Sequence, residues 1–112
     1  MLFGVKRTDA TKIRNWWGGK LPLMACEEAG EFIQAVSKAE RSEYKTNRYD
    51  DIRFLDAPVK EHLIEEIGDL AISLAAVCRL YDISEAEVQE YILHKTSMRY
   101  DLEETLKKAR RS

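Results

Sequence analysis

The chain has 112 residues, of which 45% are hydrophobic and 34% are charged, and its formal net charge is -2 at pH 7. This length supports a single domain over residues 1–112, and this composition is that of a globular protein rather than a disordered one. The lack of a basic surplus argues against a nucleic acid partner, and no uncharged apolar stretch reaches the ~20 residues of a membrane span, so we expect no membrane partner either.

Residues 1–20 predict a short helix followed by a turn. The helix runs from residue 8 or 9 to Trp17, where Gly18-Gly19 stops it. The N-terminal residues lack the apolar segment and the small-residue cleavage site of a secretory signal peptide. We therefore expect the protein to be cytoplasmic.

A long helix is predicted from Leu21 to about Arg41, with Pro22 in its first turn. Apolar residues recur along one stripe of this helix at the spacing of an amphipathic helix, namely Ala25, Ala29, Phe32, Val36 and Ala39. Residues 42–56 are polar, contain scattered aromatic residues and show no sustained period. They predict a connecting loop, and its length suggests a functional role.

Two further helices complete the predicted chain. Residues 56–58, Asp-Ala-Pro, are a good helix start, which gives a helix over about residues 58–81. Ser84 and Glu87 then form a capping box, so the last helix is expected over about residues 85–108. The sequence therefore predicts an all-α fold, an antiparallel bundle of three main helices with the short N-terminal helix added.

Cys26 and Cys78 are the only cysteines, and both fall among apolar residues. Two isolated thiols far apart in sequence make neither a disulfide framework nor a zinc knuckle. We expect both to be reduced cysteines buried in the core.

Acidic residues interrupt the apolar stripes of the two central helices. On the first of these helices, Glu28 lies inside the apolar arc and Glu31 at its edge, whereas Glu27 points to the polar side. On the second, Glu66 and Asp69 share a stripe that continues into apolar residues. Carboxylates at i and i+3 project from the same side of a helix and can share a cation. Since buried unpaired carboxylates cost several kcal/mol, two facing pairs indicate a cation site.

The expected ligands favour a hard cation. Carboxylate oxygens without Cys or His ligands are typical of Mg²⁺, with Mn²⁺ as a substitute, rather than of Zn²⁺. On the last helix Lys95 and Arg99 occupy positions on the core side. Such side chains often cover apolar surface and expose only their charged ends. Beside a metal and carboxylates they are instead candidates for phosphate contact, with Arg99 able to bind two phosphate oxygens at once.

The motifs CEEAGEFIQA at residues 26–35 and HLIEEIGDL at residues 62–70 resemble those of the MazG-like family of all-α nucleoside triphosphate pyrophosphohydrolases. The resemblance extends over about residues 21–100. The family's E-x-x-E pair, E-x-x-D pair and Lys-x-x-x-Arg element match Glu28 and Glu31, Glu66 and Asp69, and Lys95 and Arg99. Two features depart from the family, because the connection between the acid pairs is long and Leu93 replaces an asparagine that often precedes the lysine.

The resemblance implies an enzyme that hydrolyses a (deoxy)nucleoside triphosphate between its α- and β-phosphates, with Mg²⁺ as cofactor, in nucleotide-pool housecleaning. It implies that Glu28, Glu31, Glu66 and Asp69 bind the metal and carry the catalysis, and that Lys95 and Arg99 bind phosphate. Two alternatives stay open at this point. A phosphoribosyl-ATP pyrophosphohydrolase would share the fold and the metal, and a non-catalytic helical interaction module would use the same charges for packing alone.

Two further residues are candidates for the site. Trp16 suits stacking on the base of a nucleotide, although hydrophobic docking of the short N-terminal helix explains it equally well. His62, one turn before Glu66, suits orienting a metal ligand, but an exposed histidine at a helix start is the simpler interpretation.

The second central helix also predicts self-association. Between Leu70 and Tyr81 only Arg79 is charged, and apolar residues point nearly all round. Three helices from one small chain leave such a surface uncovered. We expect oligomerisation to complete the bundle, as a homodimer or homotetramer, and the resemblance implies the same.

Overall fold

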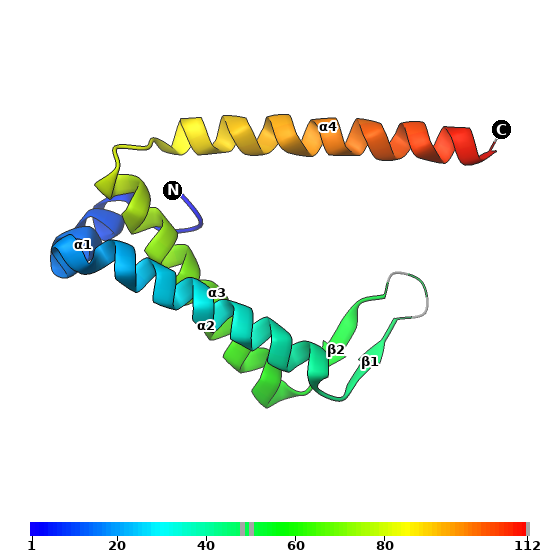
Figure 1. The fold of residues 1–112 in the computed structure, drawn as a ribbon, viewed down its shortest axis with the longest axis horizontal. Coiled ribbons are helices and arrows are strands. Elements are labelled where there is room, and N and C mark those ends of the chain that lie inside the picture. Colours follow the sequence, from blue (N-terminus) through cyan, green and yellow to red (C-terminus); the bar gives the residue numbers. More distant parts are fainter. Residues whose placement is uncertain (48, 50, 112) are drawn as a thin grey trace. The chain divides into compact units, whose positions relative to one another are not determined.

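In the computed structural model, helices account for most of the chain (Figure 1). The structure describes residues 1–47, 49 and 51–111, and for residues 99–103, 105 and 111 it describes the backbone alone. The helices are α1 (Arg7–Trp17), α2 (Leu21–Arg41), α3 (Ala57–Leu80) and α4 (Glu85–Arg111), with a 3-10 turn at Gly18–Lys20. The all-α prediction is confirmed, and the predicted helix ends agree with these bounds to within a few residues.

The chain divides into two compact units, residues 1–81 and residues 82–112. In the first unit, α1 packs against α3 and has one buried residue, Ala10, and the Arg14 guanidinium donates a hydrogen bond to the carbonyl of Arg79 at 3.4 Å. Gly18 ends α1 with a φ of 54°, in the left-handed region that glycine adopts most easily. The predicted helix stop at this position is confirmed.

The core of the first unit lies between α2 and α3, which run antiparallel and side by side (Figure 1). It consists mainly of small side chains, and the buried residues of these two helices are Leu21, Ala35, Ala39, Ser73, Ala75, Ala76 and Cys78. Val36 was predicted on the apolar stripe of α2, yet 43% of its surface is exposed. The stripe prediction is wrong at Val36, whereas Ala39 of the same stripe is buried as predicted, and Ala35 beside Val36 is buried as well.

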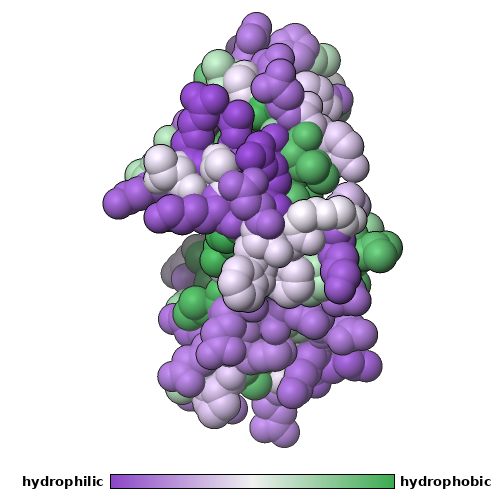
Figure 2. Space-filling view, turned by 90° about the vertical axis from the view of Figure 1, so that its left-hand side faces the viewer, coloured by the Kyte–Doolittle hydropathy of each residue, from purple (hydrophilic) through white to green (hydrophobic). Residues whose placement is uncertain are grey.

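Apolar side chains also reach the surface of the first unit. Figure 2 shows one face of the molecule, on which hydrophobic side chains lie exposed among polar ones. Cys78 is buried as expected, whereas Cys26 is exposed, so the prediction of a buried Cys26 is wrong. Both cysteines are free thiols. None of the helices, over the residues that the structure describes, is apolar enough for long enough to cross a membrane.

The predicted loop at residues 42–56 contains a short β-hairpin. Strands β1 (Tyr44–Thr46) and β2 (Arg53–Leu55) pair antiparallel, with Lys45 opposite Phe54. Arg53 donates hydrogen bonds from Nε and Nη2 to the two carboxylate oxygens of Glu40, each at 3.0 Å. The Tyr44 hydroxyl donates a third hydrogen bond to Glu40 at 3.1 Å. These contacts fasten the hairpin to the last turn of α2.

The second unit consists of α4 and the residues that lead into it. The Ser84 backbone N–H donates to Glu87 Oε2 at 2.7 Å, and the Glu87 backbone N–H donates to Ser84 Oγ at 3.1 Å. The capping box is therefore confirmed, and the hydrogen bonds from Ser84 lower the pKa of Glu87. Large apolar side chains of α4, such as Tyr91 and Met98, are exposed within this unit.

Candidate metal centre

The antiparallel pair of α2 and α3 brings three carboxylates together. Glu28 and Glu31 lie one turn apart on α2, and Glu66 lies on α3. Each offers one oxygen, and these three oxygens lie within 4.8 Å of one another. Glu28 and Glu66 are half-buried, whereas Glu31 is exposed. We refer to these three residues as the carboxylate cluster.

Asp69, the fourth predicted ligand, lies one turn beyond Glu66 on α3 and is exposed. It is not one of the three residues whose oxygens lie within 4.8 Å of one another. Its charge nevertheless raises the pKa of both Glu28 and Glu66. Asp69 therefore lies beside the carboxylate cluster, within electrostatic reach of it.

The electrostatics of the carboxylate cluster favour the binding of a positive charge. Burial raises the pKa of Glu28, and the charges of Glu31, Asp69 and Glu66 raise it further. Burial and the charge of Glu31 likewise raise the pKa of Glu66, while the nearby His62 lowers it. The Oε2 atoms of Glu28 and Glu66 are buried, and neither has a hydrogen-bond partner among the described residues. Unpaired buried carboxylate oxygens of this kind are costly unless a cation binds them.

The chemistry of the cluster fits a hard divalent cation. All of its donor atoms are carboxylate oxygens, which are the ligands that Mg²⁺ and Mn²⁺ prefer over the nitrogen and sulfur ligands typical of Zn²⁺. Mg²⁺ commonly binds through one or two carboxylates and keeps several waters or substrate oxygens. The exposed side of the cluster at Glu31 leaves room for such ligands.

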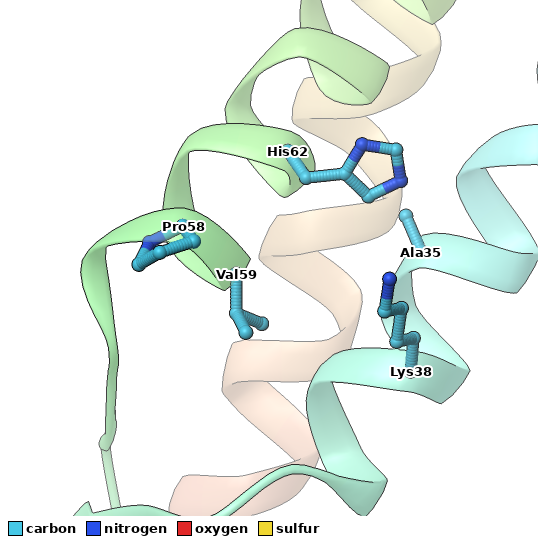
Figure 3. Close-up of a pocket in the computed structure, with 5 residues that line it drawn as sticks. All are labelled: Ala35, Lys38, Pro58, Val59 and His62. Atoms are coloured by element: carbon cyan, nitrogen blue, oxygen red, sulfur yellow. The ribbon is translucent and has the colours of Figure 1, made fainter.

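A small cavity lies further along the same pair of helices (Figure 3). It has a volume of about 90 Å³ and is lined by Ala35 and Lys38 of α2 and by Pro58, Val59 and His62 of α3. Lys38 and His62 stand on opposite walls of this cavity, and we call it the Lys38 pocket. His62 was a candidate from the sequence and Lys38 was not, although Lys38 follows Glu31 by seven residues and therefore shares its face of α2.

The remaining predicted site residues lie outside the carboxylate cluster. Trp16 on α1 is 82% exposed, so it does not dock the helix. Lys95 and Arg99 lie on α4, in the second unit. The Lys95 ammonium lies 5.9 Å from the centre of the Tyr91 ring, and the side chain of Arg99 is outside the described residues. Their phosphate contacts stay predictions.

Comparison with known proteins gives one match. The family model described as the MazG nucleotide pyrophosphohydrolase domain matches residues 20–102. This range includes both central helices, the hairpin between them and most of α4. Comparisons with curated proteins and with solved structures found no match.

Proposed function

The chain belongs to the family of MazG nucleotide pyrophosphohydrolase domains, and from this premise we propose that it hydrolyses a (deoxy)nucleoside triphosphate between the α- and β-phosphates. The products are a nucleoside monophosphate and pyrophosphate, and we assign the enzyme to nucleotide-pool housecleaning. One observation supports this proposal above the others. Three carboxylate oxygens from two helices lie within 4.8 Å of one another, and two of these residues also have a buried oxygen without a hydrogen-bond partner among the described residues.

We assign the cofactor as Mg²⁺, held by Glu28, Glu31, Glu66 and Asp69. When bound, the divalent cation neutralises phosphate charge and makes a coordinated water more acidic. Glu28 and Glu66, whose carboxylates are half-buried, would hold the cation from the two helices. Glu31, the exposed member of the carboxylate cluster, is the carboxylate most accessible to an attacking water and is suited to accept its proton.

The substrate's other parts are assigned to residues outside the cluster. We assign Lys95 and Arg99 to the phosphate chain, where their charges stabilise the negative charge that develops on the leaving group. We assign Trp16 to stacking on the base, because its ring is exposed and is therefore available to a ligand.

We also propose that the protein is a homodimer or homotetramer. Several large apolar side chains of α2 and α3 are exposed, namely Ile33, Val36, Ile64, Ile67, Ile72 and Leu74. An exposed apolar surface of this extent is typical of an interaction face. Light scattering coupled to gel filtration would test the proposal, and a monomer at micromolar concentration would contradict it.

The activity itself is tested by pyrophosphate release from a panel of ribo- and deoxynucleoside triphosphates, with phosphoribosyl-ATP included, in the presence and absence of Mg²⁺. We expect metal-dependent turnover of at least one nucleoside triphosphate and near-complete loss of turnover in Glu66→Gln. Glu65→Gln is the matched control, because it removes the same charge from an exposed neighbour on α3. Turnover that is indifferent to both Mg²⁺ and Glu66→Gln would refute the proposal.

A further inference from the structure

The Lys38 pocket has no role in the function proposed above. We propose that Lys38 and His62 bind the terminal phosphate of the substrate, so that the groove between α2 and α3 holds the part of the chain that leaves as pyrophosphate. This inference rests on the proposed function and adds to it the direction in which the polyphosphate lies. Its support comes from position, charge and size.

The positions of the two residues continue the line of the carboxylate cluster. Lys38 follows Glu31 by seven residues on α2, and His62 precedes Glu66 by four residues on α3. At about 1.5 Å per residue, these separations correspond to roughly 10 Å and 6 Å along the helix axes. Figure 3 shows the Lys38 ammonium directed along α2 toward Ala35, which is the direction of Glu31. The flexible side chain thus reaches back toward the carboxylate cluster.

The charge of the pocket suits an anionic group. Within the described part of the chain, no ion pair and no hydrogen bond engages the side chain of Lys38 or His62. His62 already acts on Glu66, whose pKa it lowers through its charge. The other walls, Ala35, Pro58 and Val59, are apolar and bring no negative charge that would repel a phosphate. Phosphate oxygens are strong acceptors for both kinds of donor.

The size and place of the pocket argue against the nucleoside. A volume of about 90 Å³ is smaller than the about 150 Å³ of a cavity that encloses a benzene ring, which favours a phosphate group over a whole base. Trp16, the residue assigned to the base, lies on α1. The contact from Arg14 to the carbonyl of Arg79 places α1 at the C-terminal end of α3, whereas the pocket lies at the N-terminal end. The base and the terminal phosphate would then extend in opposite directions from the metal.

Binding of inorganic pyrophosphate in the presence of Mg²⁺ tests the proposal directly. Lys38→Met keeps most of the aliphatic length and removes the charge, and His62→Gln removes the ring. Lys60→Met is the matched control, because Lys60 is exposed on the same end of α3 and does not line the pocket. Titration calorimetry would measure the Kd of pyrophosphate and of a nucleoside monophosphate for each variant, and circular dichroism would verify that each variant is folded.

We expect Lys38→Met to weaken pyrophosphate binding about tenfold or more, since a hydrogen bond to a charged group contributes about 1.5–3 kcal/mol. His62→Gln should weaken it to a smaller extent. Binding of the monophosphate should stay within about twofold of wild type in both variants, as should all binding by Lys60→Met. If Lys38→Met no longer folds, Lys38→Gln replaces it, because it also removes the charge and should weaken pyrophosphate binding in the same way.

Three results would overturn the inference. They are unchanged pyrophosphate binding in both pocket variants, weakened monophosphate binding with unchanged pyrophosphate binding, and no pyrophosphate binding by the wild type. The second result would assign the pocket to the nucleoside. The two proposals can fail separately. If the wild type releases no pyrophosphate from any nucleotide but binds pyrophosphate through Lys38, the proposed activity is wrong and the role of the pocket is supported. If turnover is normal but pyrophosphate binding does not depend on Lys38, the proposed activity stands and the role of the pocket is wrong.

Discussion

Removal of one charge from the carboxylate cluster should stabilise the metal-free protein. Glu28 is half-buried, its Oε2 has no partner among the described residues, and an oxygen of Glu31 lies within 4.8 Å. Two unit charges at this separation repel by about 1 kcal/mol in water and by about 3 kcal/mol at an effective dielectric constant of ~20. Because Glu28 is only half-buried, we expect the lower value. Glu28→Gln should then raise the Tm of the metal-free protein by about 4 °C.

A bound divalent cation should reverse this order. A ligand that binds only the native state stabilises it by about 2.7 kcal/mol at a concentration one hundred times its Kd. Glu28→Gln lacks one carboxylate ligand and should gain less from Mg²⁺ than the wild type gains. The variant is therefore expected to melt above the wild type in EDTA and below it in saturating MgCl₂. Glu27→Gln, which removes the same charge from an exposed neighbour, should show no such reversal.

Thermal unfolding followed by circular dichroism provides the measurement for all three proteins in both solutions. Two results would refute the reasoning. One is a Glu28→Gln variant that melts below the wild type in EDTA. The other is that MgCl₂ raises the Tm of the wild type and of Glu27→Gln by no more than it raises the Tm of Glu28→Gln.

Three further predictions concern pH, the hairpin and the start of α4. The pKa of Glu28 and of Glu66 is raised in the folded state, so the metal-free protein should gain stability as the pH falls from 7 toward 5, and Mg²⁺ should flatten this dependence in pH-dependent Tm measurements. Arg53→Met should loosen the hairpin and increase amide hydrogen exchange there. Acid should also loosen the hairpin. Hydrogen bonds from Arg53 lower the pKa of Glu40, so the stability that they contribute is lost as the pH falls below about 4.5 toward that lowered pKa. Ser84→Ala should cost about 1 kcal/mol of helix stability, visible as faster exchange in the first turn of α4 and contradicted by unchanged exchange.

The helices were predictable because their signals are local. Gly18-Gly19 ends α1, and the capping box begins α4, and both depend on residues only a few positions apart. The hairpin was not predictable in this way. Its strands have three residues each, too few to show an alternating pattern, and its attachment joins Arg53 to Glu40, thirteen residues earlier in the chain.

The candidate site was predictable in part for the same reason. The spacing of Glu28 and Glu31 places both on one face of α2 whatever the surroundings, so their proximity follows from the helix alone. That Glu66 comes within 4.8 Å of them depends on how α2 and α3 pack. The orientation of α2 was misjudged at one position, since the apolar pattern placed Val36 on the core side and Val36 is 43% exposed. Lys38 was missed because a lysine near a helix end has an ordinary explanation as an exposed residue.

The buried alanines of α2 and α3 have a consequence for the proposed metal site. Small buried side chains such as Ala35, Ala39 and Ala76 permit a close approach of packed helix axes, whose usual separation is about 8–10 Å. The distance between the α2 and α3 backbones would then determine the size of the ion that the facing carboxylates of the proposed site bind. A single bulkier residue at position 35 would widen that gap and shift the preference toward a larger ion such as Ca²⁺, with every acidic side chain left in place.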